Sequence, residues 1–241
     1  MKNPITLIKG KIVRHIESKY KKQFVDSKTI WSQYGEDIVI SWLFLHKSNG
    51  FYVDIGAYHP KKLSNTNWFY ERGWRGINID PNLDSIELFN EQRPEDINLG
   101  VGVHSTPGEL NFYKFEEPNL NTLNREVAEE HIANKIQLIN KAPVPVKRLD
   151  AIFDEHAKGR KIDFITIDAE GVDMEVLESN DWEKYYPTVV CIEDWTMDIE
   201  LYLRESKKHK FLKSKGYKLV SKVVDSYIYS SKHNRSLNDI K

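Results

Sequence analysis

The sequence predicts an α/β fold in which helices cover a mostly parallel β-sheet. Short apolar runs without helical periodicity alternate along the chain with segments whose apolar residues recur every three or four positions. Several of these runs end on an acidic residue, and no internal repeat or linker divides the chain. This alternation is typical of βαβ units, whose ligands lie at the carboxyl ends of the strands.

Length and composition limit the classes of protein to consider. At 241 residues the chain can form one substantial core. Its formal charge of -1 creates no field that would attract nucleic acid, so we expect no nucleic-acid partner. The one cysteine, Cys191, rules out an internal disulfide and fits a reducing compartment. No apolar stretch reaches the roughly 20 residues of a membrane span. We therefore expect a soluble, cytoplasmic protein.

A basic extension, residues 1–30, precedes a single domain that we expect to cover residues 31–241. Residues 1–28 hold eight basic and two acidic side chains, a local charge of +6. Four isoleucines recur there at helical spacing: Ile5, Ile8, Ile12 and Ile16. The spacing predicts an amphipathic helix. Such a helix either packs on the edge of the domain or lies on an anionic surface, at the inner face of the membrane.

The domain begins with a predicted helix that starts near Ser32 and carries acidic residues in its first turn. Its apolar residues recur at helical spacing, so we expect it to cover the sheet. The polar start of this helix, which includes Gln33, either caps the helix or lines the ligand site. The sequence alone leaves both readings open.

A first βαβ unit follows, with strands at 51–55 and 76–80 and a helix at 65–72 between them. The first strand runs through Asp54 into a tight turn at Gly56, where the missing side chain lets the backbone approach a ligand. The second strand ends on Asp80, which can bind both hydroxyls of a ribose. The unit therefore predicts a nucleotide-type ligand.

The central part of the chain adds a helix, two strands and an insertion. We expect a helix at 83–90, a strand with its exit loop at 97–103, an exposed or edge strand at 109–115 and a polar, then helical, insertion at 116–142. The insertion is predicted to lie over the carboxyl ends of the strands as a lid.

The last part of the chain completes the sheet. We expect strands at 162–168 and 188–194, each followed by a helix, and a closing pair of strands at 216–220 and 225–229. The first two of these strands end on Asp168 and on Glu193 with Asp194. Together with Asp80 they place acids at three strand ends, and buried acids without a role are costly.

The choice of cofactor depends on the turn after the first strand. A dinucleotide site uses Gly-x-Gly-x-x-Gly to hold a pyrophosphate at a helix N-terminus. Here the turn reads Ile-Gly-Ala-Tyr-His-Pro from Ile55 to Pro60, with a single glycine and bulky neighbours. S-adenosylmethionine carries no phosphate and needs no such cradle. The comparison favours a methyltransferase over an NAD-dependent dehydrogenase.

Several motifs occur in the order found in FkbM-type methyltransferases, and the chain resembles that family: Ser32-Gln-Tyr-Gly-Glu-Asp37, Phe51-Tyr-Val-Asp-Ile-Gly-Ala57, Ser64-Asn-Thr66, Gly73-Trp-Arg-Gly-Ile-Asn-Ile-Asp-Pro81, Arg148-Leu-Asp150 and Ile167-Asp-Ala-Glu-Gly171. The resemblance implies a class I methyltransferase fold, a Rossmann-like three-layer sandwich with seven strands of which the last is antiparallel. It also implies O-methylation from S-adenosylmethionine, often of sugars and secondary metabolites. The chain departs from the family pattern at Asp80, where Glu is common, and at Thr166 and Ala169.

The resemblance and the strand ends together predict the cofactor-binding residues: Gln33, Asp54, Gly56, Asn65, Thr66, Asp80 and Asp168. A sugar hydroxyl is a poor nucleophile and needs a base or a metal. We expect His59, Asp168 and Glu170 as catalytic residues. Carboxylates suit Mg²⁺ or Mn²⁺, so Asp168, Glu193 and Asp194 form a predicted metal site. The alternative is that these acids bind substrate hydroxyls directly.

We therefore predict O-methyl transfer to a carbohydrate or glycolipid hydroxyl in surface-polysaccharide or glycolipid assembly. Two alternatives remain open at this point. One is methylation of a small non-sugar metabolite, and the other is a non-catalytic nucleotide-binding module with the same fold. Neither the acceptor nor the oligomeric state follows from the sequence.

Overall fold

The computed structural model describes residues 29–231. The helix and the membrane contact predicted for residues 1–28 lie outside the described residues.

The main sheet has seven strands in the order β3-β2-β1-β7-β8-β10-β9. Their bounds are β1 Phe51–Ile55, β2 Arg75–Ile79, β3 Ile97–Leu99, β7 Phe164–Ile167, β8 Val189–Glu193, β9 Tyr217–Val223 and β10 Ser226–Ser231. Parallel pairing joins β3 through β8, and β10 runs antiparallel to both of its neighbours. The predicted sheet, including its antiparallel last strand, is confirmed.

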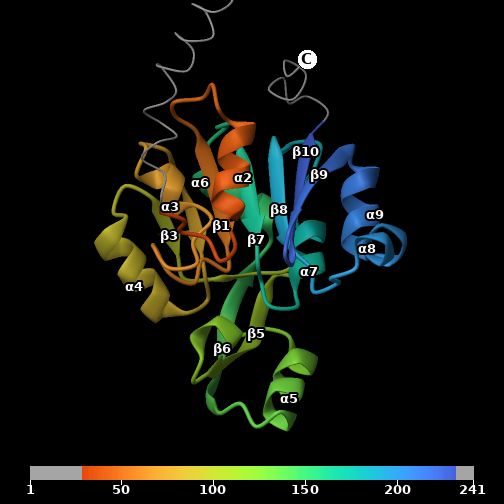
Figure 1. Ribbon diagram of the computed structural model, residues 1–241. Helices are drawn as coiled ribbons and strands as arrows, with labels where there is room; N and C mark the ends of the chain where they lie inside the picture. The colour runs from red at the N-terminus through yellow and green to blue at the C-terminus, as the bar shows by residue number, and fades with distance from the viewer. Residues whose placement is uncertain (1–28, 232–241) are drawn as a thin grey trace, which may run out of the picture. The chain divides into compact units, whose positions relative to one another are not determined.

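Helices cover both faces of this sheet, and the alternation of side chains along the strands assigns each face (Figure 1). Odd-numbered residues of β1, such as Val53, pack with helices α6, α7, α8 and α9. Tyr52 and Phe164 pack on the opposite face with α2 and α3, in an aromatic cluster that includes Phe69 and Trp74. The helices are α2 Glu36–Leu43, α3 Asn67–Tyr70, α4 Leu83–Gln92, α6 Leu149–His156, α7 Asp173–Glu178, α8 Ile199–Glu205 and α9 Lys207–Ser214.

A smaller sheet, in the order β4-β6-β5, lies beyond the carboxyl ends of the main strands together with η1 and α5 (Figure 1). Its elements are β4 Gly102–Val103, β5 Gly108–Phe115, η1 Pro118–Leu120, α5 Arg125–Ala133 and β6 Leu138–Lys147. The strand predicted within 97–103 is β3, and the exit loop predicted after it leads into β4, which belongs to the smaller sheet. The helix predicted within 116–142 ends early, because the chain turns through a left-handed Lys135 and continues as β6.

The helix predicted after β8 is divided into α8 and α9 at Ser206. This residue has an extended backbone, and its hydroxyl accepts a hydrogen bond from the His209 backbone N–H, which caps α9. Among the described residues, no helix is both long and apolar enough to cross a membrane.

Candidate active site

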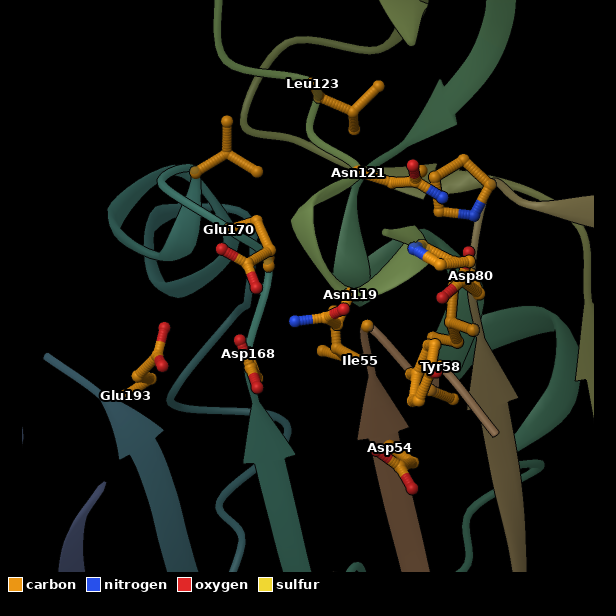
Figure 2. Close-up of a pocket in the computed structure, with 18 of the residues that line it drawn as sticks. Asp54, Ile55, Tyr58, Asp80, Asn119, Asn121, Leu123, Asp168, Glu170 and Glu193 are labelled. Atoms are coloured by element: carbon orange, nitrogen blue, oxygen red, sulfur yellow. The ribbon is translucent and has the colours of Figure 1, made fainter. Parts of the chain in front are cut away.

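A cavity of about 330 Å³ opens at the carboxyl ends of β1, β2, β7 and β8. Figure 2 shows the strand ends at the bottom, Asn121 and Leu123 of the insertion at the top, and Asn119 of the insertion between them. Ligand pockets in proteins have volumes of roughly 300–1,000 Å³. The cavity therefore lies where the strand ends predict a site, and the insertion forms its upper wall.

The end of β1 contributes Asp54 and Gly56 to the cavity lining. Burial raises the pKa of Asp54 to about 6, although a hydrogen bond from Thr66 works in the opposite direction. Gly56 has a φ of 76°, a left-handed conformation that favours glycine. Its backbone N–H donates to the Ile79 carbonyl at 3.0 Å, which ties the turn to β2.

The predicted cofactor residues Asn65 and Thr66 do not line the cavity. Thr66 is fully buried, and its hydroxyl donates to Asp54 Oδ2 at 2.6 Å. Asn65 donates through Nδ2 to the Thr166 hydroxyl at 2.9 Å. The structure thus places Thr66 behind Asp54, where it supports the carboxylate instead of facing a ligand.

A buried arginine that the sequence analysis missed completes this support. Arg93 is 1% exposed and donates to Thr66 Oγ1 at 2.8 Å and to Ser64 Oγ at 3.0 Å. It also donates to the Pro60 carbonyl. Its positive charge favours the ionised form of Asp54. No sequence pattern marks Arg93, since it follows a surface helix and resembles an ordinary solvated residue.

The end of β2 places Asp80 beside the cavity, as predicted. Its Oδ1 accepts a 2.6 Å hydrogen bond from the Asn82 backbone N–H, and burial raises its pKa to about 7. Val101, Gly102 and Val103 line the same part of the cavity and add apolar surface next to this acid. A polar group beside an apolar wall suits a ribose with an attached base.

Three carboxyl groups face the other half of the cavity: Asp168, Glu170 and Glu193 (Figure 2). Burial, reinforced by Glu193, raises the pKa of Asp168 well above its usual range. Burial and the neighbouring Asp168 raise the pKa of Glu170 to about 9. Burial, followed by the charge of Glu170, raises the pKa of Glu193 as well. Asp168 Oδ1 is buried and finds no hydrogen-bond partner among the described residues.

Asp194 does not join these acids, which corrects the predicted metal site. Its Oδ1 accepts from the Thr196 backbone N–H at 3.0 Å, and its Oδ2 lies 3.8 Å from Lys208 Nζ. Glu193 lines the cavity, whereas Asp194 lines a separate hollow with Asp173 and Lys208. Within residues 29–231 no group of three or more His, Cys, Asp or Glu side chains is arranged to hold a metal ion.

His59 lines the cavity, but its geometry differs from that of the predicted base. Its Nδ1 accepts hydrogen bonds from the backbone N–H groups of Lys61 at 2.9 Å and Lys62 at 3.0 Å. Partial burial and then Lys62 lower its pKa, which favours the neutral ring. A neutral ring that accepts at Nδ1 carries its proton on Nε2. His59 therefore offers the cavity a donor and not an acceptor.

The remaining lining includes residues that were predicted and residues that were not. Gln33 lines the cavity, so the polar start before α2 reaches the site. Tyr58, Asn119, Asn121 and Trp195 line it too, and the sequence analysis did not select them. The Asn-rich composition of the insertion was a usable signal for Asn119 and Asn121. Nothing comparable marks Tyr58 or Trp195.

The electrostatics of the lining test whether a sulfonium cofactor fits. Five carboxyl groups line the cavity, and no Lys or Arg is found among its described lining residues. A sulfonium and an ammonium group would favour the ionised form of these carboxyl groups and be attracted to them, whereas a pyrophosphate would find no Lys or Arg partner in the described lining. The unpartnered Asp168 Oδ1 supplies a free acceptor for such a cation. The residues present therefore fit S-adenosylmethionine.

The strand order, the antiparallel last strand and the cavity at the strand ends define a class I S-adenosylmethionine-dependent methyltransferase. A family model, the methyltransferase FkbM domain, matches residues 54–219, and the chain belongs to this family.

Among solved structures, the chain is similar to precorrin-6y C5,15-methyltransferase from Geobacter metallireducens GS-15, with 13% identity, 84% of this chain and 90% of that chain covered, and a TM-score of 0.42. It is also similar to a caffeoyl-CoA O-methyltransferase candidate from Staphylococcus aureus, with 12% identity, 89% and 90% coverage, and a TM-score of 0.42. At these scores nothing about the activity of this chain follows from either likeness. No curated protein sequence matches the chain.

Proposed function

We propose that this protein transfers a methyl group from S-adenosylmethionine to a hydroxyl group of a carbohydrate. The observation that carries the proposal is the convergence of Asp168, Glu170 and Glu193 on one half of the cavity, beside the half that holds Asp54 and Asp80. Carboxyl groups in either protonation state can hydrogen-bond hydroxyls, as acceptors when ionised and as donors when protonated. The cavity thus offers one half to the cofactor and one half to a polyhydroxyl acceptor.

The cofactor half uses the ends of the first two main strands. Asp80 would accept hydrogen bonds from the ribose hydroxyls, with the apolar Val101–Val103 segment against the base. Asp54, held by Thr66, would face the amino-acid part of the cofactor. Bound S-adenosylmethionine supplies a methyl group on a positively charged sulfur, which an acceptor oxygen attacks in line. Alignment of the two reactants accounts for much of the rate of such a displacement.

A residue of the acceptor half would accept the proton of the attacking hydroxyl. Asp168 lines this half of the cavity, and burial makes its carboxylate a stronger base than a free aspartate. A carboxyl group beside a cation ionises more readily, so Asp168 is expected to be ionised when the cofactor is bound. Glu170, whose pKa is about 9, is protonated at neutral pH and can donate to another acceptor oxygen.

The lining also limits the kind of carbohydrate. Because no Lys or Arg is found among the described lining residues, a phosphate or carboxylate near the reacting hydroxyl would find no cationic partner there. Trp195 lines the cavity while remaining 55% exposed, so its ring is open to the apolar face of a sugar. A neutral or amino-bearing sugar fits these groups. We also propose a cytoplasmic role in surface-polysaccharide or glycolipid assembly, since the free Cys191 suits a reducing compartment.

Two measurements test the proposal. Calorimetry with S-adenosylhomocysteine should show binding, and labelled S-adenosylmethionine should yield methylated sugars from a panel of neutral and amino glycans. The same panel includes phenols and small hydroxy acids, which represent the non-sugar alternative. Transfer only to those compounds, or cofactor binding without any transfer, would overturn the carbohydrate assignment. Asp168→Asn should bind S-adenosylhomocysteine and lose transfer.

A further inference from the structure

The insertion is fastened to the turn that carries Glu170. Thr122 Oγ1 donates to the Glu170 carbonyl at 2.6 Å, and Asn124 Nδ2 donates to the Gly171 carbonyl at 2.8 Å. The two carbonyls belong to consecutive residues, and the two side chains that donate to them are two positions apart in the insertion. The two hydrogen bonds join residues that are 48 and 47 positions apart in the sequence.

The side chains of Thr122 and Asn124 are themselves fixed by further hydrogen bonds. Thr122 is 1% exposed, and its hydroxyl accepts a 2.8 Å hydrogen bond from the Asn124 backbone N–H. Asn124 Oδ1 accepts from the backbone N–H groups of Glu126 and Val127 and so caps α5. The donors that reach the Glu170 turn therefore start from fixed positions.

The turn itself needs this support. Glu170 has a φ of 46°, a left-handed conformation that non-glycine residues rarely adopt and keep only when their surroundings hold them. At Gly171, an added Cβ would lie 2.7 Å from Val127 Cγ2, so the insertion packs closely on the turn. On the other side, Asp173 Oδ1 accepts from the Ala169 backbone N–H at 2.9 Å.

We infer that Thr122 and Asn124 are positioning residues that hold the Glu170 carboxyl group in the acceptor half of the cavity, an inference that rests on the proposed function. Because the carbonyl of Glu170 is fixed, the direction of its Cα–Cβ bond is fixed too, and its carboxyl group lies toward the cavity and near Asp168 (Figure 2). The insertion, predicted from the sequence to lie over the strand ends as a lid, is then a fixed wall that shapes the acceptor site.

The titration of Glu170 measures this directly and needs no acceptor. In the full chain, the Glu170 carboxyl carbon, labelled with ¹³C and assigned through Glu170→Gln, should titrate near pH 9. Thr122→Val removes the hydroxyl and keeps the shape of the side chain. It should release the turn, let the carboxyl group reach water and lower the midpoint by about one pH unit or more. Asn124→Ser keeps a capping side chain for α5 and removes the donor to Gly171, and it should act in the same direction.

Two control variants distinguish the loss of the hydrogen bonds that position Glu170 from a general loss of stability. Thr122→Ser retains the hydroxyl and should keep the wild-type midpoint. Tyr217→Phe removes a different buried hydrogen bond to a carbonyl, Tyr217 Oη to Pro187 at 2.6 Å, and should also leave it unchanged. Affinity for S-adenosylhomocysteine should stay within about twofold throughout.

If Thr122→Val does not fold, Asn124→Ser decides the question. A wild-type midpoint in every folded variant would overturn the inference. Unchanged methyl transfer by Glu170→Gln would instead remove Glu170 from the proposed reaction, and the titration would still show whether Thr122 and Asn124 hold it.

Discussion

The backbone of Gly56 lies directly against the backbone carbonyl of Asp168. A Cβ added at Gly56 would be 1.7 Å from that oxygen, and the glycine already has a φ of 76°. The sequence suggests that this glycine lets the backbone approach a ligand. The structure shows that its first requirement is internal, because it allows the ends of β1 and β7 to meet beneath the cavity.

Gly56→Ala is therefore expected to destabilise the fold severely. The left-handed conformation and the contact with a backbone atom act together, and the loss should be at least about 3 kcal/mol in urea unfolding. Gly73→Ala is the matched control, because Gly73 has a φ of 88° and open space around its Cβ position. It should cost only the conformational strain, about 1–2 kcal/mol. Equal losses for the two variants would contradict the role given to the contact.

Asp80→Ala should weaken binding of S-adenosylhomocysteine by roughly 30- to 150-fold. The reason is that a two-point hydrogen bond to a carboxylate contributes about 2–3 kcal/mol. Isothermal calorimetry measures the change. Asp84→Ala is the control, since Asp84 lies on α4 with a side chain that is 79% exposed and pairs with Lys114. Unchanged affinity in a folded Asp80→Ala protein would move the ribose elsewhere in the cavity.

Thr66→Val should make cofactor binding depend more strongly on pH. The Thr66 hydroxyl lowers the pKa of Asp54, which stands at about 6, so its removal shifts the ionisation of Asp54 to higher pH. Affinity for S-adenosylhomocysteine should fall about 3- to 10-fold at pH 6 and recover toward pH 8, where Asp54 is ionised again. Thr66→Ser retains the hydroxyl and should behave as wild type. A loss of equal size at both pH values would argue against this explanation.

Glu170→Gln should stabilise the unliganded protein at alkaline pH. The folded pKa of Glu170, about 9, is higher than the value near 4.3 expected for an unfolded chain. The wild type is therefore favoured by protonation at low pH and loses stability as the pH rises toward 9. Gln cannot ionise, so the variant should be more stable by about 2–4 kcal/mol at pH 8 and equal to wild type at pH 4. Urea unfolding at both pH values measures the difference. Glu178→Gln, at an exposed position on the neighbouring helix, should show no such trend.

Much of the fold could be predicted from the sequence because strands and helices have different periods. The apolar runs around Val53 and Ile165 are short and continuous, as expected for strands buried on both faces. The breaks that were missed depend on single residues, such as Ser206, which divides α8 from α9 by capping the second helix. A local hydrogen bond of this kind leaves the apolar pattern on either side unchanged.

The sequence predicts which acids lie at the strand ends, but not always the side of the sheet to which their side chains point. Asp80 and Asp168 were placed correctly at the cavity because each follows a clear strand. The alternation of strand side chains could also have separated Glu193 from Asp194, since Glu193 continues the same face as Val189 and Cys191. The metal prediction grouped neighbours in sequence that point to opposite sides of the sheet.

The sequence by itself determined the sheet, the acids at its strand ends and the resemblance that gives the family, because each depends on a local pattern. Tertiary structure alone decided that Arg93 is buried behind Asp54, that Gly56 meets Asp168, and that Thr122 holds the turn at Glu170. Those contacts join residues that are distant along the chain, and a single hydroxyl or guanidinium looks the same in sequence whether solvent or a buried partner surrounds it. Packing of the strands and the insertion brings these groups together.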